Sequence, residues 1–352
     1  MEIKYTEEEL NRLAELLLVD GGLPVADARI IARDLVQADL RGLTSHGVSR
    51  IPMYLNRIRN KVVNPNPSIR VEKRSVCSLA VHGDDGMGFI VSHRAVEEGV
   101  ELARSTGLAL VGISRSTHFG MSALYVNHAL EMGFNSLILT NSSPAIAAWG
   151  GRTPFLGAAP LAAGMVGGKH SPPYVLDMAM TVIARGKIRV AMTNGEPIPE
   201  GLALDSEGRP TTDAKKAFEG VCLPFGGVKG SALSMLMDLM AGLFTGANFG
   251  GEVKSLYYDH SEPQNVGHMF LFMRPDLFMP MDEYQDRMDT FYQRLKALPR
   301  AQGCDEIMLP GEPESRKAQQ RRIEGIPLSQ QIVDELRETA SLYGGEALTF
   351  FK

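Results

Sequence analysis

The chain contains 352 residues, of which 44% are apolar and 22% charged, and its formal net charge is −5. These values are typical of one large or two packed globular domains, and they favour neither nucleic-acid binding nor a basic membrane-binding surface. Three widely separated cysteines indicate neither a disulfide framework nor a zinc ribbon and are typical of a reducing compartment. The sequence has no apolar signal segment and no long apolar run, so it predicts a soluble, cytoplasmic protein.

The first 70 residues predict three helices. Thr6 and Glu9 have the spacing of a capping box ahead of a run with apolar periodicity, so a first helix begins there. Pro24 can occupy the first turn of a second helix, which ends near Gly42. A third helix is expected to begin close to Pro52, because proline is tolerated in the first turn of a helix and not in its interior.

Short strands and helices alternate from about residue 75. Runs rich in β-forming residues are found at 78–84, 108–114 and 135–143. Segments with helical periodicity lie between them at 94–107 and 121–133. This alternation predicts an α/β unit.

The second half of the chain begins with a Gly/Pro-rich stretch, 149–224, in which turn signals separate several short strands. A long apolar helix is expected at 231–247, followed by a strand at 267–273 and two helices at 282–297 and 329–342. The methionines of the apolar helix are typical of core packing: Met235, Met237 and Met240.

Helical terminal segments around this centre predict an α/β (α+β) fold. Residues 1–72 and 285–352 are expected to pack together as one discontinuous helical domain. Residues 73–284 are expected to form the α/β domain.

Ser45 and His46, with Arg50 and Tyr54 downstream, form the first of three clusters that are suited to chemistry. The ordinary pKa of histidine, about 6.5, suits His46 to exchange a proton as a carbonyl becomes an alcohol. Arg50 offers a planar fork that can hold a carboxylate by two parallel bonds. If the segment were helical, His46 and Arg50 would share one face at i,i+4, but Pro52 favours a position of His46 in the approach to a helix. The alternative is a surface loop with a solvated histidine and arginine.

The second cluster, Thr117-His118-Phe119-Gly120, joins the strand at 108–114 to a helix. Backbone N–H groups and a helix N-terminus can meet an anionic group at such a turn. The chain has no GxGxxG fingerprint with a downstream acid, so the turn is not that of the usual dinucleotide-binding fold. The alternative is a plain strand-to-helix turn with a hydrogen-bonded histidine.

The third cluster, at 224–230, opens the apolar helix with two glycines and Lys229. Close backbone approach, a helix N-terminus and a lysine suit a cofactor phosphate, although the pattern is not a Walker A loop. Nearby, Asp177, Arg185 and Lys187 place charges in an apolar, strand-like stretch. Buried charges need partners or a role, and the alternative is a surface ion pair.

Six motifs, in this order, resemble the malate/L-lactate dehydrogenase-like family: DLRGLTSHGVSRIPMYLNRI, STHFGMSALYVNHALEMGF, TNSSPAIAAWGG, LDMAMTVIARGKI, GEPIPEGLALDSEGRPTTD and LPFGGVKGSALSM. The family also includes ureidoglycolate and sulfolactate dehydrogenases, diketogulonate reductase and cyclic imino-acid reductases. The resemblance runs from about residue 5 to 330. It implies an enzyme that transfers hydride between NAD(P)H and a small 2-oxo or 2-hydroxy acid. It also implies a homodimer, no metal, and a nicotinamide-binding mixed-sheet domain distinct from the Rossmann fold, here residues 73–284.

The resemblance also implies roles for single residues. His46 matches the proton donor and acceptor, with Ser45 beside it, and Arg50 matches the carboxylate clamp. His118 matches a second histidine that competes for the acid/base role, and we favour His46 because Arg50 would hold the carboxylate next to the carbonyl. Further positions match substrate contacts: Tyr54, Arg185 and Gly186. The stretches that match cofactor contacts are His118, Phe119, Gly120, Met121, Ser122, Asp177, Met178, Ala179, Val228, Lys229, Leu309, Pro310 and Gly311.

Two departures from the family pattern leave the substrate open. Ala158 and Ala159 replace a Thr-Asn pair that most members carry, and Lys187 stands where the imino-acid reductases have an aspartate. Segment 226–250, in contrast, resembles the imino-acid branch. The alternatives to a 2-oxo acid are a cyclic imino acid (pyrroline- or piperideine-2-carboxylate) and a non-catalytic relative that binds a nucleotide or carboxylate. The resemblance does not decide between NAD and NADP.

Overall fold

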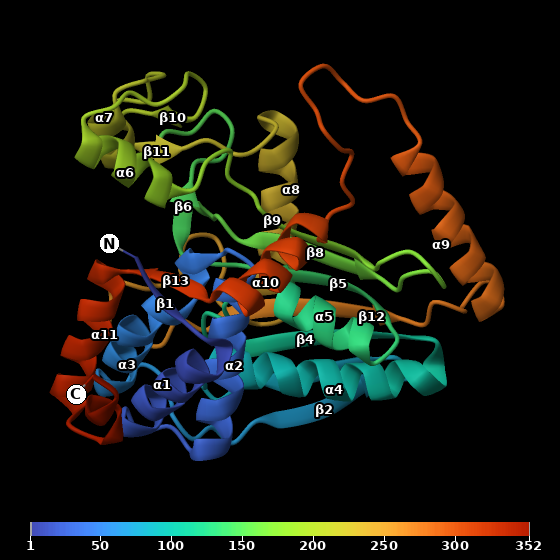
Figure 1. The fold of residues 1–352 in the computed structure, drawn as a ribbon, viewed down its shortest axis with the longest axis horizontal. Helices are drawn as coiled ribbons and strands as arrows, with labels where there is room; N and C mark the ends of the chain where they lie inside the picture. The colour runs from blue at the N-terminus through green and yellow to red at the C-terminus, as the bar shows by residue number, and fades with distance from the viewer. Residues whose placement is uncertain (1, 352) are drawn as a thin grey trace.

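A seven-stranded mixed sheet forms the centre of the structure, a computed structural model that describes residues 2–351 (Figure 1). Its strands are β2 Arg70–Ser75, β3 Ser78–His82, β4 Leu108–Ser116, β5 Asn135–Thr140, β8 Pro160–Met165, β9 Tyr174–Ala179 and β12 Val266–Met273. The order is β2-β3-β4-β12-β5-β8-β9, and β3-β4 is its one parallel pair. The expectation of a mixed, non-Rossmann sheet in an α/β fold is therefore confirmed.

Helices cover both faces of this sheet. They are α4 Gly88–Thr106 and α5 Ala123–Glu131 on one face, and α8 Val228–Asp238 with the π-helical turn η3 Leu239–Leu243 on the other. Successive side chains of the central strand β12 point to opposite faces. Phe272 packs beside Gly99 of α4, whereas Met269 packs with Ala241 of η3. This two-sided burial explains why β12 is apolar almost throughout.

The two ends of the chain pack together beside the sheet (Figure 1). This terminal unit contains β1 Glu2–Tyr5, α1 Glu7–Asp20, α2 Val25–Leu40, α3 Ile51–Arg59, α10 Glu312–Glu324, β13 Ile326–Ser329, α11 Gln330–Tyr343 and η4 Glu346–Phe351. The capping box of Thr6 and Glu9 starts α1 as predicted. Strand β1 pairs with β13 in antiparallel orientation, and α11 packs against α1 and α3. The sequence did not predict β1 or α10.

A smaller unit lies at the top of Figure 1. It contains β6 Pro144–Ile146, β7 Leu156–Gly157, α6 Arg185–Asn194, β10 Ala203–Leu204, α7 Ala214–Glu219 and β11 Val221–Cys222. The strand-like interpretation of Arg185-Gly186-Lys187 is wrong, because these residues open helix α6. Ile188, Ala191 and Met192 have helical spacing and pack into the core of this unit.

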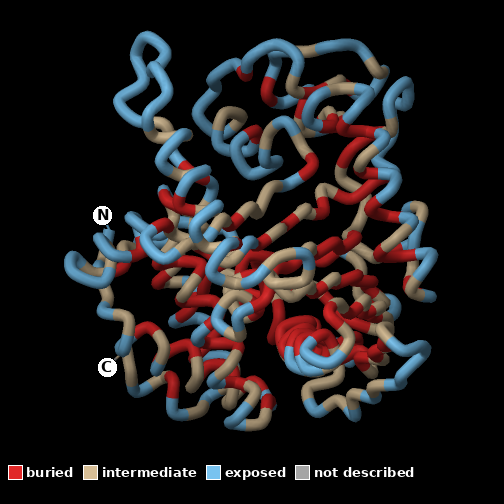
Figure 2. The backbone as a smooth tube through the Cα atoms, turned by 90° about the vertical axis from the view of Figure 1, so that its right-hand side faces the viewer, coloured by how far each residue is buried: buried red, intermediate tan, exposed pale blue. Residues whose placement is uncertain are grey.

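Buried residues concentrate in the large sheet and its covering helices, whereas the smaller unit is mostly exposed (Figure 2). Helix α8 and η3 are only half covered. Met237 is buried in the core, but Met235 is 38% exposed, so the core prediction is wrong for Met235. Helix α9, Met281–Lys296, is tied to the sheet end by Tyr284, whose hydroxyl donates to Asn135 Oδ1 at 3.2 Å.

Candidate active site

His46 and Arg50 lie in two short 3-10 turns between α2 and α3. The turns are η1 Thr44–His46 and η2 Val48–Arg50. Pro52 occupies the first turn of α3, so the helix cannot include His46, as predicted. The same turn of α3 carries Tyr54, which is buried. One short segment therefore supplies an imidazole, a guanidinium and a phenol to the same place.

The buried carboxylate of Asp39 holds this segment in place. Asp39 Oδ2 accepts a hydrogen bond from Val48 N at 2.8 Å. Gly47 leaves room for it, because a Cβ there would lie 2.1 Å from the carboxylate. Asp39 Oδ1 has no partner among the described residues. Burial raises the pKa of Asp39 to about 7, although the bond from Val48 and the charge of Arg321 oppose the rise.

The imidazole of His118 lies beside that of His46. Their ring centroids are 5.8 Å apart and their planes differ by 22°. Ser45 Oγ lies 3.0 Å from His46 Nδ1, and Tyr54 Oη lies 2.8 Å from His118 Nδ1. The two histidines that the sequence offered as rivals are thus neighbours in one site.

Both imidazoles lose basicity in this site. Burial, and next the charge of Arg50, lower the pKa of His46 to about 4. Burial, His46, Arg50 and His268 lower the pKa of His118 well below its ordinary value. The pair is therefore neutral at pH 7 when no anion is bound.

Arg50 carries a positive charge that no carboxylate of residues 2–351 balances by an ion pair. Its Nε donates to the carbonyl oxygen of Ser45, and its Cζ lies 5.3 Å from the ring centroid of Tyr257. Burial lowers its pKa. A half-buried guanidinium without a counter-charge is suited to bind an anionic ligand.

The turn that carries His118 rests on a stack of buried rings. Phe119 lies between His268 and Tyr125, with centroid distances of 4.4 and 4.9 Å. His268 is held on both sides, by Thr140 Oγ1 at 2.7 Å and Ser116 Oγ at 2.9 Å. These contacts fix the turn at the end of β4 and so fix the position of His118.

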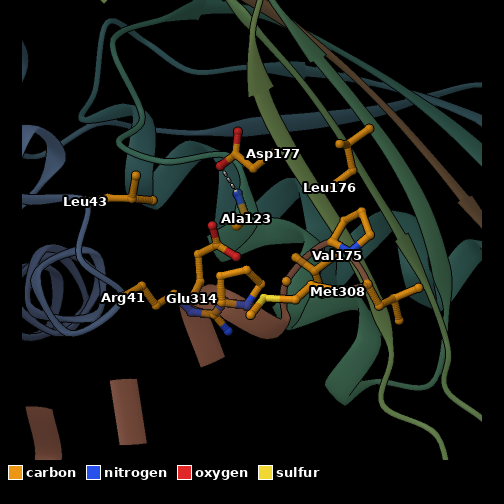
Figure 3. A pocket seen from close by; sticks show the side chains of 12 residues that line it. Arg41, Leu43, Ala123, Val175, Leu176, Asp177, Met308 and Glu314 are labelled. Carbon is orange, nitrogen blue, oxygen red and sulfur yellow. Dashed lines mark hydrogen bonds between the residues drawn. The ribbon is translucent and has the colours of Figure 1, made fainter. Parts of the chain in front are cut away.

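A cavity of about 240 Å³ opens between the end of α2, the start of α5, strand β9 and the start of α10 (Figure 3). It is lined by Arg41, Leu43, Ala123, Val175, Leu176, Asp177, Met308, Leu309, Pro310, Gly311, Pro313 and Glu314. Leu43 precedes His46 by three residues, and Ala123 directly follows the turn from His118 to Ser122. The structure thus brings together three of the stretches that the resemblance assigned to the cofactor: the 118–122 turn, Asp177 and 309–311.

Asp177 occupies the position at the start of α5 where an anionic ligand group was expected. Its Oδ2 accepts from Ala123 N at 2.8 Å (Figure 3). Burial raises its pKa to about 6 against the bonds from Ala123 and Ser122. Carboxylates of Asp177 and Glu314, the guanidinium of Arg41 and apolar walls fit a nucleoside with hydroxyl groups better than a phosphate. The cavity is large enough for one part of a dinucleotide.

The remaining predicted residues lie elsewhere. Arg185 donates to the carbonyl oxygen of Phe218 at 2.9 Å and covers its ring, and Gly186 follows it in α6. Val228 and Lys229 form the exposed start of α8, and Met178 and Ala179 end β9. None of these lines the cavity. The pattern of charges near Asp177 is not an ion pair, because Asp177 binds backbone N–H groups.

Several residues of the site had no signal in the sequence. Asp39 and Arg41 belong to a run that reads as an ordinary helix end, and Tyr257 is about 200 residues from Arg50. Glu314 lies in α10, which was not predicted. Tertiary contacts alone bring them to the site.

Comparison with known proteins matches residues 5–337 to the family described as malate/L-lactate dehydrogenase. The chain belongs to this family. The malate/L-lactate dehydrogenase family explains the mixed sheet, the absent GxGxxG motif and the order of the six motifs. The prediction of an NAD(P)-dependent 2-hydroxy-acid dehydrogenase is confirmed at this level.

Three curated members of the family are similar over nearly their whole lengths. L-sulfolactate dehydrogenase of Methanocaldococcus jannaschii is 35% identical over 337 residues, 96% of each chain. (2R)-3-sulfolactate dehydrogenase (NADP(+)) of Chromohalobacter salexigens is 35% identical over 94% of this chain and 96% of its own. Ureidoglycolate dehydrogenase (NAD(+)) of Escherichia coli K12 is 32% identical over 95% and 94%. Both nicotinamide cofactors therefore occur among the relatives.

Two solved structures show the same fold. The M. jannaschii sulfolactate dehydrogenase has a TM-score of 0.93 at 33% identity and covers 99% of this chain and 100% of its own. The Δ1-piperideine-2-carboxylate reductase of Pseudomonas syringae has a TM-score of 0.85 at 28% identity, with coverages of 96% and 100%. No helix within residues 2–351 is long and apolar enough to cross a membrane.

Proposed function

We propose that this dehydrogenase reduces a small 2-oxo acid reversibly, with Arg50 binding the carboxylate and His46 exchanging the proton with O2. One observation carries the proposal: an unpaired, half-buried guanidinium lies beside two neighbouring imidazoles. Asp177 and the residues around its cavity would hold part of the cofactor, whose nicotinamide would supply or accept the hydride at C2.

The hydrogen bonds of the two histidines support different roles for them. His118 Nδ1 accepts from Gly120 N at 3.3 Å, so this nitrogen carries no proton, and Tyr54 Oη donates to it as well. A proton on Nδ1 would face the N–H of Gly120, so His118 stays neutral and presents Nε2–H. Such an imidazole can polarise the substrate carbonyl. His46 Nδ1 meets a hydroxyl, Ser45 Oγ, which can donate or accept, so His46 can change its protonation state.

Binding of the acid adjusts the pKa of His46 in the required direction. Burial and the positive charge of Arg50 hold this pKa at about 4 in the free protein. A carboxylate on Arg50 balances that charge, so the proton affinity of His46 rises as the acid binds. In reduction His46 then gives its proton to O2, which becomes the hydroxyl oxygen, and in oxidation it takes the proton back.

Two glutamine variants test these roles, with NAD(P)H absorbance as the readout. His46→Gln should lower kcat by roughly 10²–10⁴-fold, the contribution typical of a positioned acid/base. His118→Gln keeps a hydrogen-bond donor and should retain more activity. Near-wild-type turnover of His46→Gln together with loss of activity in His118→Gln would exchange the two roles.

The relatives guide the choice of substrates. The most similar ones described above act on sulfolactate, so sulfopyruvate leads the panel, followed by oxaloacetate and pyruvate. A cyclic imino acid is the second candidate, because the P. syringae reductase shares the fold and because Ala158 and Ala159 supply no hydrogen-bonding side chains. Turnover of Δ1-piperideine-2-carboxylate without turnover of any 2-oxo acid would favour that candidate.

We also propose a cytoplasmic homodimer. The exposed apolar side chains of α8 and η3 support a second copy as the partner, since Leu236, Leu239 and Leu243 are each about half exposed. Sedimentation equilibrium should give twice the chain mass for the wild-type protein and a smaller value for Leu239→Glu. A wild-type monomer would refute the dimer.

A further inference from the structure

A distant loop lies against Arg50. This segment, loop 253–264, comes between η3 and β12 and carries Tyr257. The guanidinium carbon of Arg50 lies 5.3 Å from the centroid of the Tyr257 ring. Tyr257 is 47% exposed, so burial of the ring in the core does not explain its position.

Helix α3 anchors this loop through Arg57 and Asn56. Arg57 is 1% exposed, and its Nη1 donates to the carbonyl oxygens of Ser255 and Asp259, both at 3.2 Å. Asn56 Nδ2 lies 3.1 Å from His260 Nε2. Because a buried guanidinium needs such partners, the loop is held at a defined position relative to α3.

The same short stretch of chain thus points two residues at the substrate site and two at the loop. Arg50 and Tyr54 belong to the site, whereas Asn56 and Arg57 bind the loop. The loop in turn places the ring of Tyr257 against the face of the Arg50 guanidinium. With Nε bound to the carbonyl oxygen of Ser45 and one face on the ring, the guanidinium is left with its two Nη groups for a ligand.

We propose that Tyr257 is a positioning residue, which holds the guanidinium of Arg50 in the orientation that binds the substrate carboxylate. The inference rests on the proposed function of Arg50. A ring under a partly desolvated guanidinium restricts its rotation and stabilises its charge, and both effects act on binding of the acid rather than on the proton transfer.

Three variants test the proposal in the full-length protein. Tyr257→Leu removes the ring and should raise KM for the 2-oxo acid by roughly 3- to 30-fold, the range that a cation–π contact supports, with kcat and the KM for NAD(P)H changed less than twofold. Tyr257→Phe keeps the ring and should behave as wild type. Tyr258→Leu is the matched control, because Tyr258 is its neighbour and is 83% exposed.

A double-mutant cycle shows whether Tyr257 acts through Arg50. In an Arg50→Met background, Tyr257→Leu should leave kcat/KM for the acid unchanged. An unchanged KM in Tyr257→Leu alone, or an equal loss in Tyr257→Phe, would overturn the proposal.

Failure of the proposed function would look different. If the wild-type protein reduces no acid of the panel, calorimetric titration with oxamate, a non-reducible 2-oxo acid analogue, replaces the kinetic readout. Weaker oxamate binding in Tyr257→Leu than in Tyr257→Phe would support the positioning role, and equal binding or no binding to any variant would reject it.

Discussion

Asp39→Asn should change how the stability of the protein depends on pH. Asp39 lies beneath the turn between His46 and Arg50, is 1% exposed and accepts from Val48 N. Asparagine can also accept that bond with Oδ1, but it cannot ionise. The variant therefore separates the cost of burying the charge from the benefit of the hydrogen bond.

The magnitude follows from the pKa of Asp39 in the two states. Burial raises this pKa from 3.8 in the unfolded chain to about 7 in the folded one. Between these values the folded state binds one more proton than the unfolded state, so the free energy of unfolding falls as pH rises. At about 1.4 kcal/mol per pH unit, the loss between pH 4 and pH 8 is about 4 kcal/mol, and it levels off once the pH exceeds the folded-state pKa by about one unit.

Urea unfolding of both proteins at several pH values between 4 and 8 measures this effect. An unpaired amide in the variant adds a constant offset, so the informative quantity is how the gap between the two curves changes with pH. That gap should shift by about 4 kcal/mol in favour of Asp39→Asn as the pH rises. Asp334→Asn is the control, because the Asp334 side chain is 47% exposed. Parallel curves for wild type and Asp39→Asn would refute the reasoning.

Three further predictions concern ligand binding. Arg50→Lys should raise KM for the 2-oxo acid by about tenfold or more, because lysine cannot form two parallel bonds to a carboxylate, and an unchanged KM would remove Arg50 from the substrate site. In the wild type, the KM for NAD(P)H should fall between pH 5 and pH 7 as Asp177 ionises near its pKa of about 6. Asp177→Asn should abolish this fall, and equal pH profiles of the two proteins would contradict the prediction. Lys229→Ala should raise the KM for NAD(P)H and leave the KM for the acid unchanged if Lys229 meets a cofactor phosphate, and identical cofactor kinetics would exclude that contact.

Local sequence signals predicted the parts of the fold that local physics decides. The capping box fixed the start of α1, and Pro52 placed His46 ahead of α3. Helix α10 was not predicted because its sequence, EPESRKAQQRRIE, is polar on all sides and its amphipathic pattern is too weak to detect. Strand β1 was not predicted because its four residues are ordered by pairing with β13, which lies more than 300 residues away in the sequence.

Sequence signals also predicted only some of the residues of the candidate site. The order of the motifs identified His46, Arg50 and His118, and the structure places the two imidazoles side by side. The contacts of Asp39 with Val48 and of Arg50 with Tyr257 depend on the folded backbone, and residue types alone do not indicate them. The resemblance assigns Arg185 to the substrate, but in the structure its Nη2 donates to the carbonyl oxygen of Phe218 within the smaller unit.

The joined termini have a consequence for synthesis of the protein. The segment with His46 and Arg50 emerges early from the ribosome, yet α2 and α3 pack against α10 and α11, and Arg321 Nη1 donates to the carbonyl oxygen of Asp39. A nascent chain in which the whole central sheet has been synthesised still lacks α10 and α11. Catalytic competence should therefore appear only after release of the finished polypeptide, and stalled chains that end before residue 312 should be inert.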